Sequence, residues 1–134
     1  DKRVITQYLK LVSNGGSLVP TPLLSVAADL YEDEAHVADI RAYYHANFTL
    51  VERHLGISPP QGGFFLWLKV DDDLQFVRRL MAEQAVRALP GSFMGVETAD
   101  GNPGAGYVRF ALVHNAKITD EALGRVAKIY KSQV

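Results

Sequence analysis

The sequence predicts an α/β protein in which most residues form one α+β small domain, a small sheet covered by helices. Stretches whose apolar residues recur at helical spacing alternate with short apolar runs that are flanked by glycine and proline. The chain has 134 residues, enough for one ordinary core. Its hydrophobic share of 48% and charged share of 22% are near globular averages, which excludes a disordered or fibrous chain.

Charge, cysteine content and hydropathy exclude several classes of protein. The net charge is -1, from 14 Lys and Arg against 15 Asp and Glu, so we expect no binding surface for nucleic acid or membrane. The chain has no cysteine, which excludes disulfides and fits a reducing compartment. No apolar run approaches the roughly 20 residues of a membrane span, and the first residues lack the apolar core of a signal peptide. We expect a cytoplasmic protein.

The first part of the chain predicts helices. Residues 1–12 fit the end of a helix, and residues 13–17 form a polar, glycine-rich turn. Thr21 as N-cap and Pro22 at the first helical position open a second helix, which the acidic patch 32–34 interrupts. A third helix follows, ended by Gly56, with six apolar side chains on one face: Val37, Ile40, Tyr44, Phe48, Val51 and Leu55.

The second part predicts a sheet. Residues 64–70 read as a strand buried on both faces, and residues 71–73, all aspartate, supply the N-cap and a negative first turn for a helix. The remaining elements are a short strand over 86–89, an irregular loop to Gly106, a last strand over 107–113 and a helix capped by Thr119. After the first turn the order is therefore α, α, β, α, β, β, α, with the helices on one face of the sheet.

Arg109 is the candidate binding residue. Strand side chains alternate, so Val108, Phe110 and Leu112 share one face and Arg109 lies on the other, in an otherwise apolar strand. A guanidinium group there needs an anionic partner, because its desolvation is costly. The partner is either a carboxylate of the same domain or the carboxylate of a ligand, bound bidentately. Periodicity does not separate the two.

Four blocks of the sequence resemble consecutive blocks of the class I/II aminotransferases, which are pyridoxal-phosphate-dependent enzymes of fold type I. The blocks occur in the family's order and cover essentially the whole chain: SNGGSLVPTPLLSVAADL at 13–30, PPQGGFFLWLKV at 59–70, LPGSFMG at 89–95 and NPGAGYVRFALVH at 102–114. The branch they resemble most includes the succinyldiaminopimelate aminotransferases. The resemblance implies the C-terminal part of such an enzyme, with residues 1–34 as the incomplete end of the large cofactor-binding domain and 35–134 as the small domain.

The resemblance also implies roles for individual residues. The arginine of the family's final-strand block binds the α-carboxylate of the substrate, and this position falls on Arg109. The family's Schiff-base lysine lies upstream of the block that begins at Ser13, so no catalytic or cofactor-binding residue is expected in this chain. Pyridoxal 5'-phosphate is expected in the intact enzyme and not on this chain alone. Ser13 and Asn14 would lie at the subunit boundary of a homodimer, near the partner's active site, although a simple turn explains them equally well.

The sequence is compatible with two functions. The first is the C-terminal region of an enzyme that transfers an amino group between an amino acid and a 2-oxo acid, inactive by itself. The alternative is a free-standing α+β module that binds a small carboxylate or has a regulatory role, and that catalyses no reaction. The first predicts that residues 1–34 expose an apolar surface or pair with another copy, and the second predicts that this segment folds onto the small domain. His36, His45 and His54 point alternately to opposite helix faces, so no metal site is expected.

Overall fold

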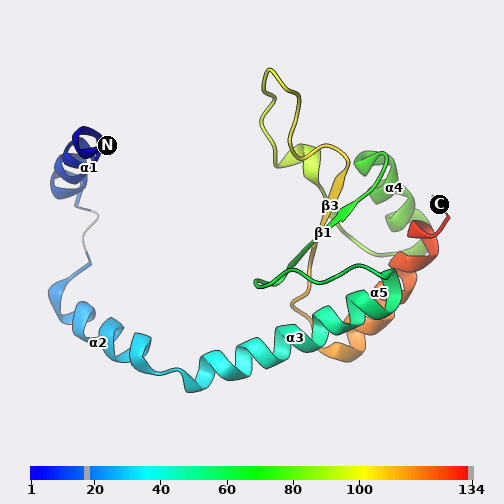
Figure 1. The fold of residues 1–134 in the computed structure, drawn as a ribbon, viewed down its shortest axis with the longest axis horizontal. Helices are drawn as coiled ribbons and strands as arrows, with labels where there is room; N and C mark the ends of the chain where they lie inside the picture. Colours follow the sequence, from blue (N-terminus) through cyan, green and yellow to red (C-terminus); the bar gives the residue numbers. More distant parts are fainter. Residues whose placement is uncertain (17–18, 133–134) are drawn as a thin grey trace. The chain divides into compact units, whose positions relative to one another are not determined.

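The computed structural model describes residues 1–16 and 19–132 of the chain. Residues Asp1–Ala38 and Asp39–Val134 form two compact units, and the boundary between them falls inside a helix. The elements are α1 (Lys2–Asn14), α2 (Thr21–Glu32), α3 (Ala35–Leu55), β1 (Phe65–Lys69), α4 (Asp73–Gln84), β2 (Leu89–Pro90), the 3₁₀ helix η1 (Gly91–Phe93), β3 (Tyr107–Ala111) and α5 (Ala116–Tyr130) (Figure 1). No helix of the described residues is long and apolar enough to cross a membrane.

Helices α1 and α2 have no buried residue. Within their own unit these two helices therefore lack the packed apolar face that normally supplies most of the stability of short helices. The large apolar side chains that these helices expose are Val4, Ile5, Tyr8, Leu9, Leu11, Leu23, Leu24, Val26, Leu30 and Tyr31.

The predicted ends of the first two helices were wrong by one or two residues. Helix α1 continues through Ser13 and Asn14, which the sequence predicts to lie in the turn. Both side chains donate to the main-chain oxygen of Lys10, over 3.0 Å and 2.9 Å, which ties them to the last turns of the helix. Helix α2 begins at Thr21 and has Pro20 as its N-cap, without a side-chain capping bond.

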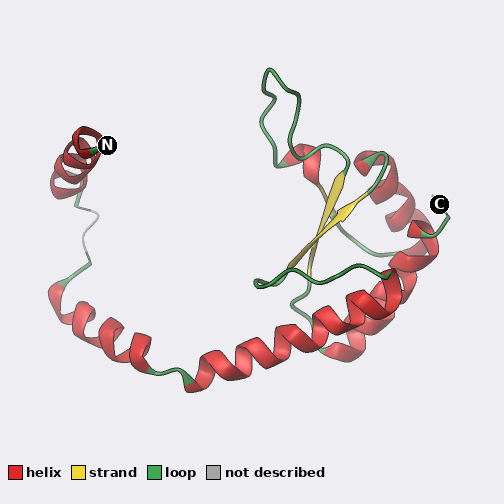
Figure 2. Ribbon diagram, in the orientation of Figure 1, coloured by secondary structure: helices red, strands yellow, loops and turns green. Residues whose placement is uncertain are grey.

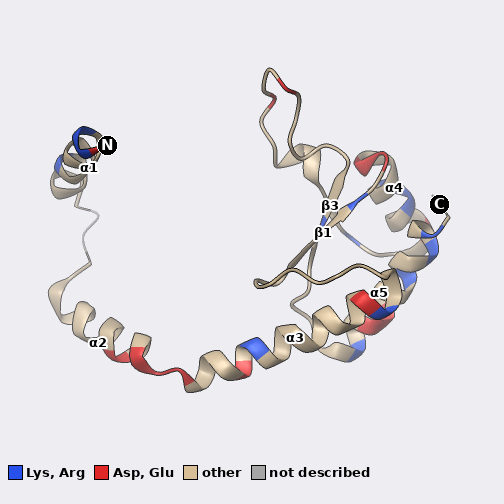
Figure 3. Cartoon of the chain, viewed as in Figure 1, with Lys and Arg blue, Asp and Glu red and all other residues tan. Residues whose placement is uncertain are grey.

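The predicted break between the second and third helices is confirmed. Helix α2 ends at Glu32, and the carboxylate of Asp33 accepts a hydrogen bond from the main-chain nitrogen of Ala35 at 3.0 Å, where α3 begins. Figure 3 shows acidic residues gathered at this junction. At the other end, α3 stops at Leu55, and Gly56 has a φ of 68°, a conformation that glycine adopts without strain. The predicted apolar face is buried in the C-terminal half of α3, at Phe48, Val51 and Leu55.

The sheet is antiparallel, with strand order β1-β3-β2. Together with α4, α5 and the end of α3 on one side of the sheet (Figure 2), it confirms the predicted α+β class. The predicted strand over 86–89 was misplaced, because β2 comprises only Leu89 and Pro90. Ala85 ends α4 in the left-handed region, with a φ of 54°, and the chain then needs three residues to reach the sheet. The last strand ends at Ala111, two residues before its predicted end.

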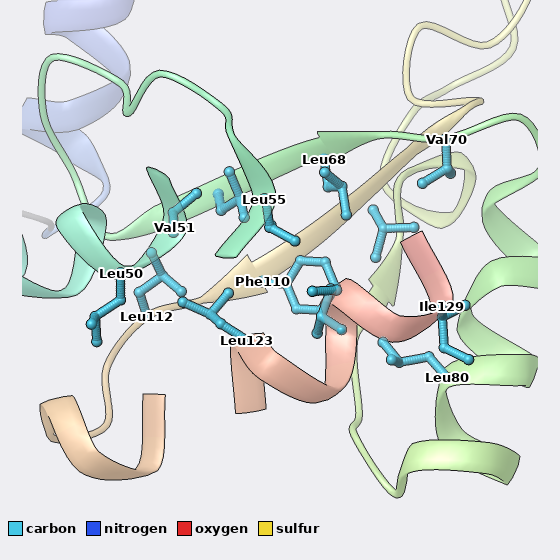
Figure 4. Close-up of a cluster of buried hydrophobic side chains, with 14 of the residues drawn as sticks. Leu50, Val51, Leu55, Leu68, Val70, Leu80, Phe110, Leu112, Leu123 and Ile129 are labelled. Atoms are coloured by element: carbon cyan, nitrogen blue, oxygen red, sulfur yellow. The ribbon is translucent and has the colours of Figure 1, made fainter. Parts of the chain in front are cut away.

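The core lies between the inner face of the sheet and the helices α4, α5 and the end of α3. Figure 4 shows Leu68 and Phe110 pointing from the strands into this core. The predicted face of the last strand is confirmed, since Val108, Phe110 and Leu112 are all buried. The prediction that β1 is buried on both faces was wrong, because Trp67 is 44% exposed on the side opposite the core. The continuous apolar run was misleading, since its aromatic residues extend over the open face.

Side-chain caps begin both helices that cover the sheet. Asp72 is the N-cap of α4 and accepts from the main-chain nitrogen of Gln75 at 2.9 Å, which confirms the predicted capping by the aspartate run. Helix α5 is capped by Asn115 and not by Thr119. Thr119 is a buried residue within the helix, and its hydroxyl donates to the main-chain oxygen of His114 at 3.0 Å.

Candidate functional site

The sheet face turned away from the core carries the candidate site. We call it the outer face. Its side chains are those that alternate with the buried residues of the three strands: Phe65, Trp67, Lys69, Leu89, Tyr107, Arg109 and Ala111.

Arg109 lies at the centre of the outer face. It belongs to the middle strand and pairs with Trp67 of β1 on one side and Leu89 of β2 on the other. Its side chain is partly buried, and the guanidinium carbon lies 4.4 Å from the centroid of the Phe65 ring. This cation–π contact is worth about 0.5–1 kcal/mol at exposed sites and more where water is excluded, and it holds the guanidinium group over the sheet.

The hydrogen-bonding groups of Arg109 remain available. Among residues 1–16 and 19–132, no carboxylate forms an ion pair with Arg109, and its side chain donates no hydrogen bond. The ion pair within the domain, which the sequence left open, is therefore absent from the described part of the chain. A planar guanidinium group positioned in this way can bind a carboxylate bidentately.

Aromatic side chains lie next to the contact between Arg109 and Phe65. The rings of Phe64 and Phe65 lie 4.3 Å apart, and Tyr44 of α3 stacks on Phe64 at 5.5 Å. On the other side of the arginine, the rings of Trp67 and Tyr107 meet edge to face at 6.4 Å. Sequence reasoning missed this cluster, although the aromatic run from Phe64 to Trp67 was the signal for it.

A buried carboxylate positions the loop that follows β2. Asp73, in the first turn of α4, is 6% exposed and accepts a hydrogen bond from the main-chain nitrogen of Ser92 at 2.8 Å. Burial alone would raise the pKa of Asp73, but hydrogen bonds from Ser92 and from nearby main-chain groups outweigh it and lower the pKa below its ordinary value. The sequence indicated only a helix cap at this aspartate run, and the contact with Ser92 was missed.

The loop from residue 91 to residue 106 is held closed at its base. The side-chain nitrogen of Asn102 donates to the main-chain oxygen of Ser92 at 2.9 Å, and its side-chain oxygen accepts from the main-chain nitrogen of Gly104 at 2.9 Å. Gly91 and Gly104 touch so closely that a Cβ on Gly91 would lie 2.2 Å from the main-chain oxygen of Gly104. The loop predicted to be irregular is therefore fixed to the end of the sheet beside Trp67.

The other two predicted site residues belong to the first unit. Ser13 and Asn14 are exposed in the last turn of α1, whereas Arg109 lies in the second unit. Their hydrogen bonds to Lys10 are local, and a role at a subunit boundary stays a prediction.

The residues of this chain do not fit the cofactor that the resemblance implies. A lysine that forms a Schiff base must have a lowered pKa, which requires a desolvated or cationic environment. Every lysine of the chain is exposed: Lys2, Lys10, Lys69, Lys117, Lys128 and Lys131. These lysines therefore do not fit the Schiff-base role. No group of three or more potential metal ligands occurs among the described residues.

Comparison with known proteins identifies the family. The family model described as aminotransferase class I and II matches residues 1–126. The crystal structure of an aminotransferase from Neisseria meningitidis has 32% sequence identity and a TM-score of 0.80 over 97% of this chain and 35% of that chain. The chain thus spans about a third of the length of this relative. No curated protein sequence matches the chain.

Two further structures share the fold at lower identity. Aminotransferase AspB from Helicobacter pylori has 22% identity and a TM-score of 0.76, over 98% of this chain and 34% of that chain. An aromatic aminotransferase from Pyrococcus horikoshii has 24% identity and a TM-score of 0.63, over 79% of this chain and 30% of that chain. Because the family model covers nearly all of the sequence, the chain belongs to the aminotransferase class I and II family.

Proposed function

We propose that this chain is the C-terminal region of an aminotransferase that transfers an amino group between an amino acid and a 2-oxo acid. In this proposal Arg109 binds the α-carboxylate of the substrate. The observation that carries it is the state of Arg109: a guanidinium group held over Phe65 at 4.4 Å, without a carboxylate partner among the described residues. A bound carboxylate would supply the missing counter-charge and fix the position of the substrate.

The intact enzyme would hold pyridoxal 5'-phosphate, as its family does, through residues outside this chain. That cofactor supplies electron withdrawal from the substrate Cα. What this chain contributes is the carboxylate contact and the rigid sheet that carries it. By itself the chain would be inactive. We also propose that the intact enzyme is a cytoplasmic homodimer in which Ser13 and Asn14 lie near the subunit boundary.

The narrower proposal is the branch of the succinyldiaminopimelate aminotransferases. It rests on the four sequence blocks alone. The test is direct: the intact enzyme should transfer the amino group of N-succinyl-diaminopimelate to 2-oxoglutarate. No transfer from N-succinyl-diaminopimelate would place it in another branch and would leave the role of Arg109 unaffected.

A free-standing module that binds a carboxylate is the second candidate. The core of the second unit favours it, because residues 39–132 bury their own apolar side chains. Against it stands the family match over residues 1–126. We therefore favour the aminotransferase.

Substitution of Arg109 in the intact enzyme tests the proposed role. Loss of a hydrogen bond to a charged group costs about 1.5–3 kcal/mol, so Arg109→Gln should lower kcat/KM for the amino-acid substrate by about 10- to 150-fold. Arg109→Lys should retain part of the activity, because the charge remains and the bidentate geometry does not. The matched control is Arg79→Gln, which removes a guanidinium group that pairs with Glu83 on the surface of α4. Equal kcat/KM in the Arg109 and Arg79 variants would refute the carboxylate contact.

A further inference from the structure

We propose that the outer face holds a subsite for a large apolar side chain next to Arg109, formed by Trp67, Tyr107 and Met94. This inference rests on the proposed carboxylate contact of Arg109 and adds the substrate class: amino acids whose side chain carries a ring or a run of methylene groups. Short acidic side chains and very small side chains would be poor ligands.

The spacing of the outer face supports this arrangement. Phe65 pairs with Ala111, and Trp67 pairs with Arg109. Arg109 contacts Phe65, and Tyr107 contacts Trp67, so the same diagonal contact is repeated two residues further along both strands. Two residues of an antiparallel strand span roughly 7 Å. A ligand with its carboxylate on Arg109 would therefore reach the Trp67 and Tyr107 rings with a side chain about the length of phenylalanine.

The surface beyond these two rings is a shallow pocket without charge. It has a volume of about 470 Å³, within the roughly 300–1,000 Å³ typical of small-molecule sites. Figure 3 shows that most of the loop from η1 to β3 is also uncharged and that its acidic residues lie near the tip. The residues that line the pocket are Trp67, Met94, Gly95, Pro103, Gly104 and Tyr107. Such a lining favours contact with apolar groups, because it offers aromatic and aliphatic surface and no charged partner.

The wall of the pocket is held in place before any ligand arrives. Asn102 ties the two sides of the loop together through Ser92 and Gly104. A Cβ on Gly95 would lie 2.0 Å from the side-chain oxygen of Asn102, so this approach requires glycine. A fixed wall reduces the entropy lost on binding, which makes a weak apolar contact effective in discriminating between ligands.

Lys69 is the residue that would favour the opposite interpretation, a preference of the outer face for acidic side chains. It pairs with Tyr107 on the outer face, is exposed and could attract an acidic side chain. It is not among the residues that line the pocket. Since the pocket is apolar and the lysine lies outside it, we infer selection for apolar side chains, and an acidic ligand serves as the contrary probe.

Dissociation constants of three simple carboxylates, measured by ligand-detected NMR on the intact enzyme, test the subsite. The probes are propanoate, 3-phenylpropanoate and glutarate, which share one carboxylate and differ in the rest. The enzyme should bind 3-phenylpropanoate about 10- to 150-fold more tightly than propanoate. Trp67→Ala should remove most of this preference, and Trp67→Phe should keep it. Phe93→Ala is the matched control, because Phe93 is an exposed aromatic residue of the same loop outside the pocket, and it should change nothing.

The outcomes separate the subsite from the carboxylate contact. If Trp67→Ala weakens the binding of propanoate and 3-phenylpropanoate equally, or weakens the binding of neither, the proposed subsite is wrong. If glutarate binds more tightly than 3-phenylpropanoate and Lys69→Gln abolishes its advantage, the face selects acidic side chains and the proposal is overturned. Met94→Glu provides a second variant that leaves the sheet intact and should weaken only 3-phenylpropanoate. Arg109→Gln should weaken all three probes, and if it weakens none, the carboxylate contact itself has failed.

Discussion

Asp73 fixes the loop after β2 to the start of α4, and its removal should be costly. The carboxylate is 6% exposed and accepts the main-chain N–H of Ser92 at 2.8 Å. Asp73→Ala leaves this part-buried donor without a partner and removes a hydrogen bond to a charged group, which together cost about 1.5–3 kcal/mol. Urea unfolding of the intact protein measures the loss. Asp71→Ala is the matched control, because Asp71 is exposed in the same aspartate run, and it should change the free energy of unfolding by less than about 0.5 kcal/mol.

The same contact predicts a pH dependence of known sign. The pKa of Asp73 is lowered in the folded state, so its contribution to stability is present above the unfolded-state pKa of about 3.9 and is lost as the pH falls through the folded-state value. The difference in unfolding free energy between the wild type and Asp73→Asn should therefore be constant from about pH 7 to pH 5 and shrink below about pH 4. A difference that stays the same at pH 3, or a cost no greater than that of Asp71→Ala, would refute the reasoning.

Two further substitutions test the packing of the second unit. Gly91→Ala should lower the free energy of unfolding by about 1–3 kcal/mol, because the new Cβ would meet the main-chain oxygen of Gly104 at 2.2 Å, whereas Gly62→Ala meets nothing within 4 Å and should be nearly neutral. Phe76→Ala should cost about 3–5 kcal/mol, since Phe76 is fully buried, while Phe93→Ala, at a side chain 72% exposed, should cost little. Thermal unfolding monitored by circular dichroism measures both pairs, and equal shifts within either pair would contradict the packing described.

Local patterns were enough to predict much of the fold. The alternation along β3 correctly assigned Phe110 to the core, because a strand places successive side chains on opposite faces. The helical stripe correctly placed Phe48 and Val51 on the buried face of α3. The acidic junction after α2 and the cap at Asp72 were also predictable, since both depend on contacts within four residues.

Contacts between distant segments were not predictable in this way. The aromatic run of β1 looked doubly buried, but whether Trp67 is covered depends on the layers that surround the sheet. The displacement of β2 follows from the left-handed conformation of Ala85, a residue type that gives no signal for it. For Arg109, the sequence indicated the need for an anion, but the lack of a carboxylate nearby in the described chain is a property of the assembled unit. The bond from Ser92 to Asp73 joins residues 19 positions apart.

The central claim is that Arg109 recognises the substrate α-carboxylate, and a comparison of two substrates tests it most directly. The intact enzyme is assayed with an amino acid and with the amine that lacks only its carboxylate. The wild type and Arg79→Gln should prefer the amino acid strongly, and Arg109→Gln should reduce this preference in kcat/KM by about 10- to 150-fold. An undiminished preference in Arg109→Gln would show that another group binds the carboxylate.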